Sequence, residues 1–402
     1  MNFPARPCPV CLSDRKQVLY RQKFFPLSGQ LQLRGYAVAQ CGKCGTAYAE
    51  NIPDQKWFGA YYREISKYTH DQRAGEESAS DTERFRDIAQ FISKHLPGKQ
   101  SRIFDMGCAS GGLLRRLKDL GFTQLLGMDK SPSSAELARR LHGIRVVNSD
   151  LEEIAYNEEP FDLLIQVGVL EHIRDVEGAL TSMSSVLRPG GLIYLEVPDV
   201  AGFAEWPGAP FQQFSIEHIN FFSRSSLIAL MARKGFEAVE VIRTARDHTS
   251  NTKMPVVCGF FRQTDVAPKG EPKVDLETGP ALRRYIEEST QAERRIAQVI
   301  DTLVSSQEPI LVWGVGTHTL HLIETTAFGR MNVVAFIDSN PGYQERELQG
   351  KRVIAPSALN GSPERILISS QVFQAEIEDQ IKLQLRLPNE VILLYKTVTS
   401  HS

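Results

Sequence analysis

Apolar and polar positions recur with helical spacing in some stretches of the middle of the chain and form short runs in others. Ser80–Leu96 and Leu113–Leu120 carry apolar residues at helical spacing. Short apolar runs between such stretches predict buried strands that end near Phe104, Met128 and Val147. Because strands and helices alternate in this order, the pattern predicts a mostly parallel sheet with helices on both faces. The active face of such a sheet is at the carboxyl ends of its strands.

The last third of the chain shows the same alternation again. A charged, proline-containing interval at residues 263–280 predicts a linker, and a long amphipathic helix follows it. A strand and glycine turn at Ile310–Thr317 precede a strand that ends at Asp338. The turn reads Gly-x-Gly, but Leu320 stands where a dinucleotide fingerprint has its third glycine. We favour a Rossmann-like domain that packs or holds substrate without a cofactor of its own, with nucleotide binding as the alternative.

The glycine-rich turn after the first strand of the middle region carries the most chemical information. It spans Asp105–Gly112, between a strand and a helix. Glycines such as Gly107 and Gly111 let the backbone come close to a ligand. Asp129 ends the next strand, and an acid at roughly 20 residues past the glycines commonly binds the ribose hydroxyls of an adenosine ligand. The sequence therefore predicts a cofactor that contains adenosine.

The spacing of this turn separates the candidate cofactors. Gly107 is followed by three other residues and then by paired glycines, which is not the Gly-x-Gly-x-x-Gly spacing of a dinucleotide site. Asp105 would repel a pyrophosphate but could pair with the ammonium group of an amino acid. The turn resembles motif I of class I S-adenosylmethionine (SAM) methyltransferases.

Later segments resemble further motifs of that class, in the same order. Asn148–Leu151 follows the third strand, where the class places an acid that contacts adenine. Phe161–Ile173 resembles its fourth strand and VLEH-type loop, and Leu187–Gly191 matches the turn before its fifth strand. Phe236–Arg243 and Val256–Phe261 resemble its final antiparallel hairpin. The resemblance implies that SAM is bound by Asp105, Gly107, Gly111, Asp129, Asp150 and Leu151.

Four of the six cysteines form two Cys-x-x-Cys pairs near the start of the chain. These are Cys8, Cys11, Cys41 and Cys44. Without an export signal, structural disulfides are not expected, and two such pairs can bring four thiolates to one tetrahedral zinc ion. Four sulfur ligands close the coordination shell, so we expect a structural zinc rather than a catalytic one. A redox or vestigial site is the alternative.

Composition and charge narrow the choice of partners. The chain has 402 residues and a formal net charge of −2, which favours two or three domains and indicates no basic footprint for nucleic acid. No apolar run approaches the roughly 18 residues of a membrane span. The first residues also lack the apolar core of a signal peptide. We therefore expect a cytoplasmic enzyme that acts on a small molecule, without a nucleic-acid or membrane partner.

The order of the segments resembles one methyltransferase family over nearly the whole chain. A four-Cys zinc module at residues 1–60, a SAM domain at 61–262, a linker at 263–280 and a Rossmann-like domain at 281–402 resemble the NDP-sugar C-methyltransferases. The resemblance implies an acceptor that is a nucleotide-linked 4-keto deoxysugar, held over the methyl donor with help from the C-terminal domain.

The same family lines its active site with a Tyr-His-Glu-His segment followed by aromatic residues and Ser. Glu217 and His218 match this segment, whereas Ser215 and Ile216 replace its Tyr and first His. Histidine suits general-base catalysis because its pKa is near neutrality, so we expect His218 to remove the acceptor proton and Glu217 to orient it or bind substrate. His172, after the fourth strand, is expected in the cofactor pocket or at a helix cap.

Further residues and functions stay open at this point. Glu171 could face the cofactor or cap a helix, and Tyr61, Tyr62 and Tyr68 could reach the site or pack between modules. The runner-up activity is O- or N-methylation of a polyketide, peptide or glycan. A protein that uses the SAM fold for binding or scaffolding, without turnover, is the alternative outside enzymes.

Overall fold

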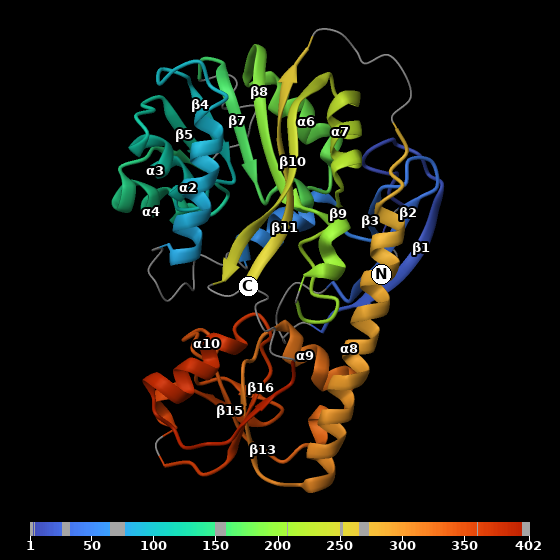
Figure 1. Ribbon diagram of the computed structural model, residues 1–402, viewed down its shortest axis with the longest axis vertical. Coiled ribbons are helices and arrows are strands. Elements are labelled where there is room, and N and C mark those ends of the chain that lie inside the picture. The colour runs from blue at the N-terminus through green and yellow to red at the C-terminus, as the bar shows by residue number, and fades with distance from the viewer. Residues whose placement is uncertain are drawn as a thin grey trace. The chain divides into compact units, whose positions relative to one another are not determined.

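Figure 1 shows the computed structural model of the chain. The structure describes residues 3, 5–25, 33–64, 77–148, 158–206, 208–249, 252–264, 273–359 and 361–395. The chain divides into two compact units. The first comprises Met1–Gln22, Tyr36–Trp206 and Phe214–Arg283, and the second comprises Lys23–Gly35, Pro207–Gln213 and Arg284–Ser402.

The first unit contains a seven-stranded mixed sheet, and Figure 1 shows helices α2 (Ala79–Ser93) and α7 (Arg224–Arg233) beside it. Five neighbouring strands are parallel, and a long antiparallel hairpin continues the sheet at one edge. In spatial order the strands are β10 (Phe236–Thr249), β11 (Thr252–Gln263), β8 (Leu187–Pro198), β7 (Phe161–Val167), β4 (Ile103–Met106), β5 (Leu125–Met128) and β6 (Val146–Val147).

Alternating side chains of these strands face two different hydrophobic cores. Ile103 belongs to one core and its neighbour Phe104 to the other, as the two-residue period of a strand requires. Helices α2, α3 and α4 contribute to the core of Ile103, whereas α6 and α7 contribute to the core of Phe104. The sheet is therefore covered on both faces, by α2 (Ala79–Ser93), α3 (Gly112–Asp119), α4 (Pro132–His142), α6 (Val176–Ser185) and α7 (Arg224–Arg233).

The strand order reverses between β4 and β7. The chain runs from β4 outward to β5 and β6, and then returns to the other side of β4 with β7 and β8. In open sheets of this kind, ligands bind beyond the carboxyl ends of the strands at such a switch point. Two loops leave the sheet there, one after β4 and one after β7, and the second contains the short helix η2 (Leu170–His172).

A four-stranded sheet holds the N-terminal segment. Its spatial order is β1 (Lys16–Lys23), β2 (Gly35–Cys41), β3 (Ala47–Glu50) and β9 (Asn220–Phe221), and helix α1 (Gln55–Glu64) follows β3. Because β9 comes from the middle of the chain, the N-terminal segment shares a sheet with the region next to His218. Ala47 pairs with Phe221 and Tyr48 with Asn220.

The second unit has a six-stranded sheet in which five strands are parallel. In spatial order these strands are β14 (Glu347–Leu348), β15 (Lys351–Ile354), β13 (Val333–Ile337), β12 (Ile310–Trp313), β16 (Arg365–Ile368) and β17 (Val391–Leu393). The later part of α8 (Thr278–Ser306), α9 (Thr317–Thr325), α10 (Gln374–Asp379) and the short π-helical turn η6 (Gln380–Gln384) accompany it. In the turn after β12, Gly314 has a φ of 107° and the Val315 amide donates to Asp338 at 3.0 Å.

The α/β class expected from the sequence is confirmed: both units contain Rossmann-like parallel sheets, and four cysteines cluster near the N-terminus. Some elements differ in extent. The β10–β11 hairpin is longer than its apolar runs, and β8 begins at Leu187, before the Gly190 turn at φ 73°. Among the helices of the described residues, none combines the length and apolarity that crossing a bilayer requires.

The interval expected to be a linker contains a buried residue. Asp275 is 3% exposed, its amide donates to Cys44 O at 2.8 Å, and its carboxylate accepts the hydroxyls of Ser223 at 2.6 Å and Thr278 at 2.7 Å. Asp275 thus joins the second Cys pair, the N-terminal cap of α7 and the start of α8. The expected boundaries of the linker and domains stay predictions.

Candidate active site

The turn after β4 depends on glycine at Gly107. Its φ is 84°, and a Cβ there would lie 2.5 Å from Cγ2 of Val169. Both the conformation and the close approach favour glycine at this position. Val169 directly precedes η2, so this contact brings the expected cofactor loop against the loop that carries Glu171 and His172.

Asp129, the expected ribose ligand, holds the glycine-rich turn in place. One carboxylate oxygen accepts the Ala109 amide at 3.0 Å. The other accepts the Ser131 amide at 2.8 Å and the Ser134 hydroxyl at 3.1 Å. An ionised carboxylate offers about four acceptor positions, so three are used within the protein. The turn also includes Gly111, which caps α3 at a φ of 82°.

Asp105 lies near the end of β4 as a buried carboxyl group. It is 3% exposed, and burial, followed by repulsion from Asp129, raises its pKa to about 8. Within the described residues no basic side chain forms an ion pair with Asp105. An ammonium or sulfonium group at this turn would lower the raised pKa of Asp105, because an opposite charge favours the ionised carboxylate. The chemistry of this donor set therefore fits SAM. Asp150 and Leu151 lie outside the described residues.

The loop after β7 places an imidazole with a defined orientation. Nδ1 of His172 lies 2.8 Å from the Glu217 carbonyl oxygen. A carbonyl can only accept, so Nδ1 carries the proton and a neutral ring keeps its Nε2 lone pair. Nε2 of His172 lies 3.7 Å from Oε1 of Glu171. The ring centroids of His172 and His218 are 5.1 Å apart.

Glu171 is the buried acid of this cluster. It is 3% exposed, and no group in the described part of the chain forms a hydrogen bond with its buried Oε2 atom. Burial raises the pKa of Glu171, while His172 opposes that shift. A buried carboxylate oxygen without a donor is costly, so this atom is placed to accept from a group that the described residues do not supply. Helix capping and cofactor contact stay the two roles expected of Glu171 from the sequence.

The segment that carries Glu217 and His218 is tied to the loop after β7. The Ile219 amide donates to Glu171 O at 2.9 Å. The amide group of Asn220 donates to Leu170 O at 3.0 Å and Ile173 O at 2.8 Å. The structure therefore brings together Glu171, His172 and His218, with Glu217 touching the cluster through its backbone carbonyl. No sequence motif had singled out Asn220.

Two N-terminal residues, missed from the sequence, also hold this segment. Tyr36 donates its hydroxyl to Ser215 O at 3.0 Å and to His218 O at 3.1 Å. Arg6 is 2% exposed and donates to Ile219 O at 3.0 Å and to the side chain of Asn220. Burial lowers the pKa of Arg6 to about 9. No local pattern predicts these contacts, because they join residues about 200 positions apart.

The tyrosines expected near the site are only partly described. Tyr61 is 7% exposed and stacks on Trp57, with ring centroids 5.4 Å apart. This geometry fits the packing role among the two that the sequence left open. Tyr62 lies in α1, and Tyr68 lies outside the described residues.

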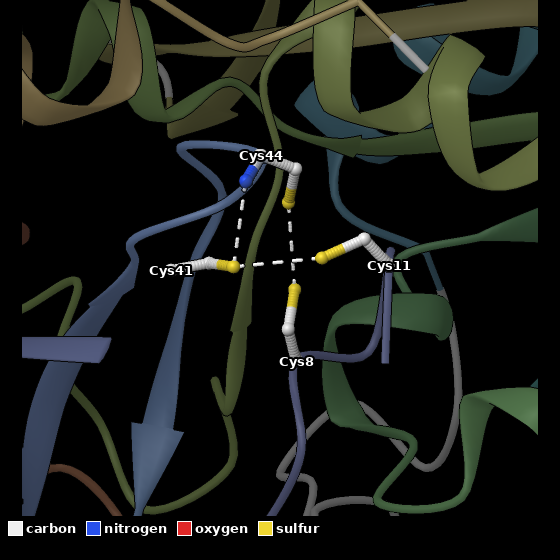
Figure 2. Close-up of side chains that lie close together, drawn as sticks. All are labelled: Cys8, Cys11, Cys41 and Cys44. Carbon is white, nitrogen blue, oxygen red and sulfur yellow. Dashed lines mark hydrogen bonds between the residues drawn. The ribbon is translucent and has the colours of Figure 1, made fainter. Parts of the chain in front are cut away.

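The four N-terminal cysteines converge as two crossed pairs (Figure 2). Sγ of Cys8 lies 3.5 Å from Sγ of Cys44, and Sγ of Cys11 lies 3.5 Å from Sγ of Cys41. None of them forms a disulfide. Tetrahedral zinc with Zn–S bonds of about 2.3 Å places its sulfurs about 3.8 Å apart. The arrangement therefore fits zinc, and the amides of Lys43 and Cys44 point at Cys41 Sγ as further donors.

Two stretches of the chain match known protein families, one mainly in the first unit and one in the second. Residues 80–241 match a family described as methyltransferase domain. Residues 306–393 match a family described as C2185-like, N-terminal. The first match covers β4 to β8, the glycine-rich turn and the cluster around His172, so the recognised domain contains the candidate active site.

Curated relatives match over less than two thirds of their own length. A tRNA U34 carboxymethyltransferase of Saccharophagus degradans is 26% identical over 208 residues, which are 48% of this chain and 63% of the relative. A ubiquinone biosynthesis O-methyltransferase of Cereibacter sphaeroides is 33% identical over 108 residues, 25% of this chain and 43% of the relative.

A solved structure aligns over its whole length but over only part of this chain. A Burkholderia thailandensis 1,6-didemethyltoxoflavin-N1-methyltransferase, with 1,6-didemethyltoxoflavin and S-adenosylhomocysteine bound, aligns with a TM-score of 0.42 at 20% identity. That alignment covers 61% of this chain and 100% of the other.

Proposed function

We propose that this chain, whose residues 80–241 form a class I SAM-dependent methyltransferase domain, transfers the methyl group of SAM to a small-molecule acceptor. The observation that carries the proposal is Asp105, a buried carboxyl group beside the glycine-rich turn with no cationic partner among the described residues. The methionine ammonium group of SAM supplies the missing charge. Asp129 keeps one acceptor position for a ribose hydroxyl.

The transfer itself needs little covalent chemistry from the protein. The acceptor atom forms a bond to the methyl carbon while the S–CH3 bond breaks, and the sulfonium becomes a neutral thioether. Positioning the two reactants in line supplies much of the acceleration. The chain's own residues must orient the acceptor and take its proton. His218 is the proposed base, and Glu217 the proposed group that orients it or binds substrate.

The acceptor that we propose is a nucleotide-linked deoxysugar or a related small metabolite. Support comes from the Glu-His-x-x-Phe-Phe-Ser segment that begins at Glu217, and from the order of the cysteine cluster, the methyltransferase domain and the second parallel sheet. O- or N-methylation of a polyketide, peptide or glycan is the runner-up. A structural zinc at the four cysteines and a cytoplasmic location complete the proposal.

Isothermal titration calorimetry and mass spectrometry test this function separately. The protein should bind SAM and S-adenosylhomocysteine with one site per chain. Extract of the native organism, incubated with the protein and SAM labelled in the methyl group, should then yield a labelled small molecule. SAM binding without any labelled product, in extract or with a panel of sugar nucleotides, would favour the non-catalytic alternative.

A further inference from the structure

We propose that Glu171, His172 and His218 form a binding site for a divalent transition-metal ion, separate from the four-cysteine site. One ligand atom from each residue lies within 4.8 Å of the other two. Donors on one ion, at bonds of about 2.1 Å, lie about 3.0–3.4 Å apart. The longest separation among the three ligand atoms therefore needs to shorten by up to about 1.4–1.8 Å when an ion binds.

The orphaned oxygen of Glu171 is the observation that points to a ligand. Its Oε2 atom is buried without a hydrogen-bond partner among the described residues, in a side chain that is 3% exposed. Buried polar atoms are almost always satisfied by protein, water or an ion. A cation bound by this carboxylate would satisfy the oxygen and offset the cost of burying it.

His172 has the orientation of a metal ligand. Its Nδ1–H donates to the Glu217 carbonyl at 2.8 Å, which fixes the ring and directs Nε2 toward Glu171, 3.7 Å away. Metal-binding histidines almost always donate the other ring proton to a carbonyl or carboxylate in this way. The backbone carbonyl of Glu217, rather than its side chain, thus orients the His172 ring for metal binding.

The ligand set selects the kind of metal. Two imidazoles and one carboxylate suit zinc, iron(II), cobalt(II) or manganese(II), whereas magnesium and calcium prefer oxygen ligands. Three protein ligands leave coordination positions open, as in sites where a metal binds substrate. The site is therefore built differently from the closed set of four cysteines.

The role of the ion rests on the proposed methyl transfer, although the binding site itself does not. Glu171 and His172 lie in the loop after β7, whose Val169 leaves no room for a Cβ at Gly107 of the glycine-rich turn, and His218 lies just before β9. An ion at an open position there would bind the acceptor's hydroxyl or enol oxygen, lower its pKa, and release the proton to water. In the metal-bound protein the His218 imidazole is a ligand, whereas in the metal-free protein it keeps the proposed role of base, so metal content decides between the two roles.

Metal titration on the zinc-loaded full-length protein tests the site. Cobalt(II) is the probe, because calorimetry gives its stoichiometry and visible absorption reports imidazole and carboxylate ligands. Wild type should bind a second metal equivalent beyond the cysteine-bound zinc. Glu171→Gln and His172→Gln should each weaken this binding by about 10- to 100-fold or more, with the cysteine-bound zinc retained by elemental analysis.

His142→Gln is a matched control. Nε2 of His142 lies 3.6 Å from Oε1 of Glu77, a spacing close to that of the His172–Glu171 pair. Arg116 already binds Glu77 at 2.8 Å, and no third metal-ligating side chain joins this pair among the described residues. Removing His142 should leave the second cobalt equivalent unchanged. Equal loss of cobalt binding in this variant and the site variants would overturn the assignment.

The remaining outcomes separate this site from the proposed function. A protein that takes up no second equivalent in excess cobalt, or binds it equally in wild type and the site variants, has no metal site at Glu171. If such a protein still binds SAM and transfers its methyl group, the function stands and the metal site fails. If cobalt binds as expected but SAM does not, the metal site stands and the methyltransferase function fails.

Discussion

The hydroxyl of Tyr36 donates a hydrogen bond to the backbone carbonyl of His218, at 3.1 Å. The same hydroxyl also reaches the Ser215 carbonyl at 3.0 Å. One side chain of the N-terminal sheet thus holds both ends of the Ser215–His218 segment through hydrogen bonds to its backbone. The N-terminal segment therefore contributes directly to the geometry of the candidate active site, through backbone contacts rather than through catalytic groups.

Tyr36→Phe should slow methyl transfer while SAM affinity stays unchanged. The variant loses a hydroxyl that fixes two carbonyls, each hydrogen bond contributing about 1 kcal/mol to holding the segment, and both carbonyls belong to residues 215–218 rather than to the glycine-rich turn. Turnover with labelled SAM and calorimetry of SAM binding measure the two effects. Tyr48→Phe is the matched control, because the described residues offer the buried Tyr48 hydroxyl no hydrogen-bond partner. Equal turnover of both variants would refute a positioning role for Tyr36.

SAM binding should release a proton near neutral pH. The pKa of Asp105 is raised to about 8 in the ligand-free protein, and the cationic cofactor favours its ionised form. Below pH 8, SAM affinity should therefore increase by up to about tenfold for each unit by which the pH is raised. Calorimetry in buffers of different ionisation enthalpy counts the released proton. Asp105→Asn should bind SAM more weakly and without proton release.

The same group should make the ligand-free protein less stable as pH rises. The native state keeps the Asp105 proton up to about pH 8, whereas the unfolded chain loses it near its ordinary value of 3.8. Protonated Asp105 favours the folded state, so its contribution is greatest below the unfolded pKa and is lost as pH rises toward 8. Urea unfolding at several pH values should show that the free energy of unfolding falls less with rising pH in Asp105→Asn than in wild type.

Asp129→Ala should reduce SAM affinity at least tenfold, about 1.4 kcal/mol. The variant removes the proposed ribose ligand and also the acceptor of the Ala109 amide, so the ligand-free protein should unfold at a lower temperature as well. Ser134→Ala is a control that removes one hydrogen bond to Asp129 and leaves its carboxylate in place. SAM affinity in that variant should stay within a few-fold of wild type. Unchanged affinity in Asp129→Ala would remove the assignment.

Much of this fold could be predicted because its signals are local. The strand that contains Asp105, its glycine turn and the acid at Asp129 lie within one strand–helix–strand unit, and apolar runs mark its strands. The sequence could not show that Asp129 also holds the turn. That contact depends on the backbone at Ala109, where φ is 48°. An alanine does not predict a positive φ, so the sequence contains no sign of this conformation.

Other features escaped prediction because they depend on long-range contacts. Arg6 reaches Ile219 and Asp275 reaches Ser223 only once the sheets have formed. Charged side chains are usually exposed, so the sequence alone would place Arg6 and Asp275 at the surface, whereas both are buried. The cluster of Glu171 with His218 likewise follows from a loop-to-loop pairing that spacing cannot reveal.

One equivalent of zinc should be bound by the four N-terminal cysteines. Cys41→Ser removes one of four thiolates, so elemental analysis should show zinc loss, and the N-terminal sheet should lose protection from hydrogen exchange. Because Tyr36 and Arg6 hold the segment of His218, turnover should fall as well. Cys258→Ala is the control, since Cys258 is buried elsewhere and lies outside the cluster. A metal-free protein whose N-terminal sheet is fully protected would contradict the zinc proposal.

His218→Ala should lower turnover by about 10²- to 10⁴-fold, the usual effect of removing a general base, with SAM binding retained. His218→Gln keeps a polar side chain of similar reach but cannot accept the proton at neutral pH, so it should be similarly slow. Rapid-quench measurement of methyl transfer in a single turnover isolates this step. His95→Gln is a suitable control, because His95 lies on α2's C-terminal side against Phe91 and Glu240. If both His218 variants react within a few-fold of wild type, His218 is structural, and the search for a base moves to His172, to Tyr61 and its neighbours, or to an acceptor that needs none.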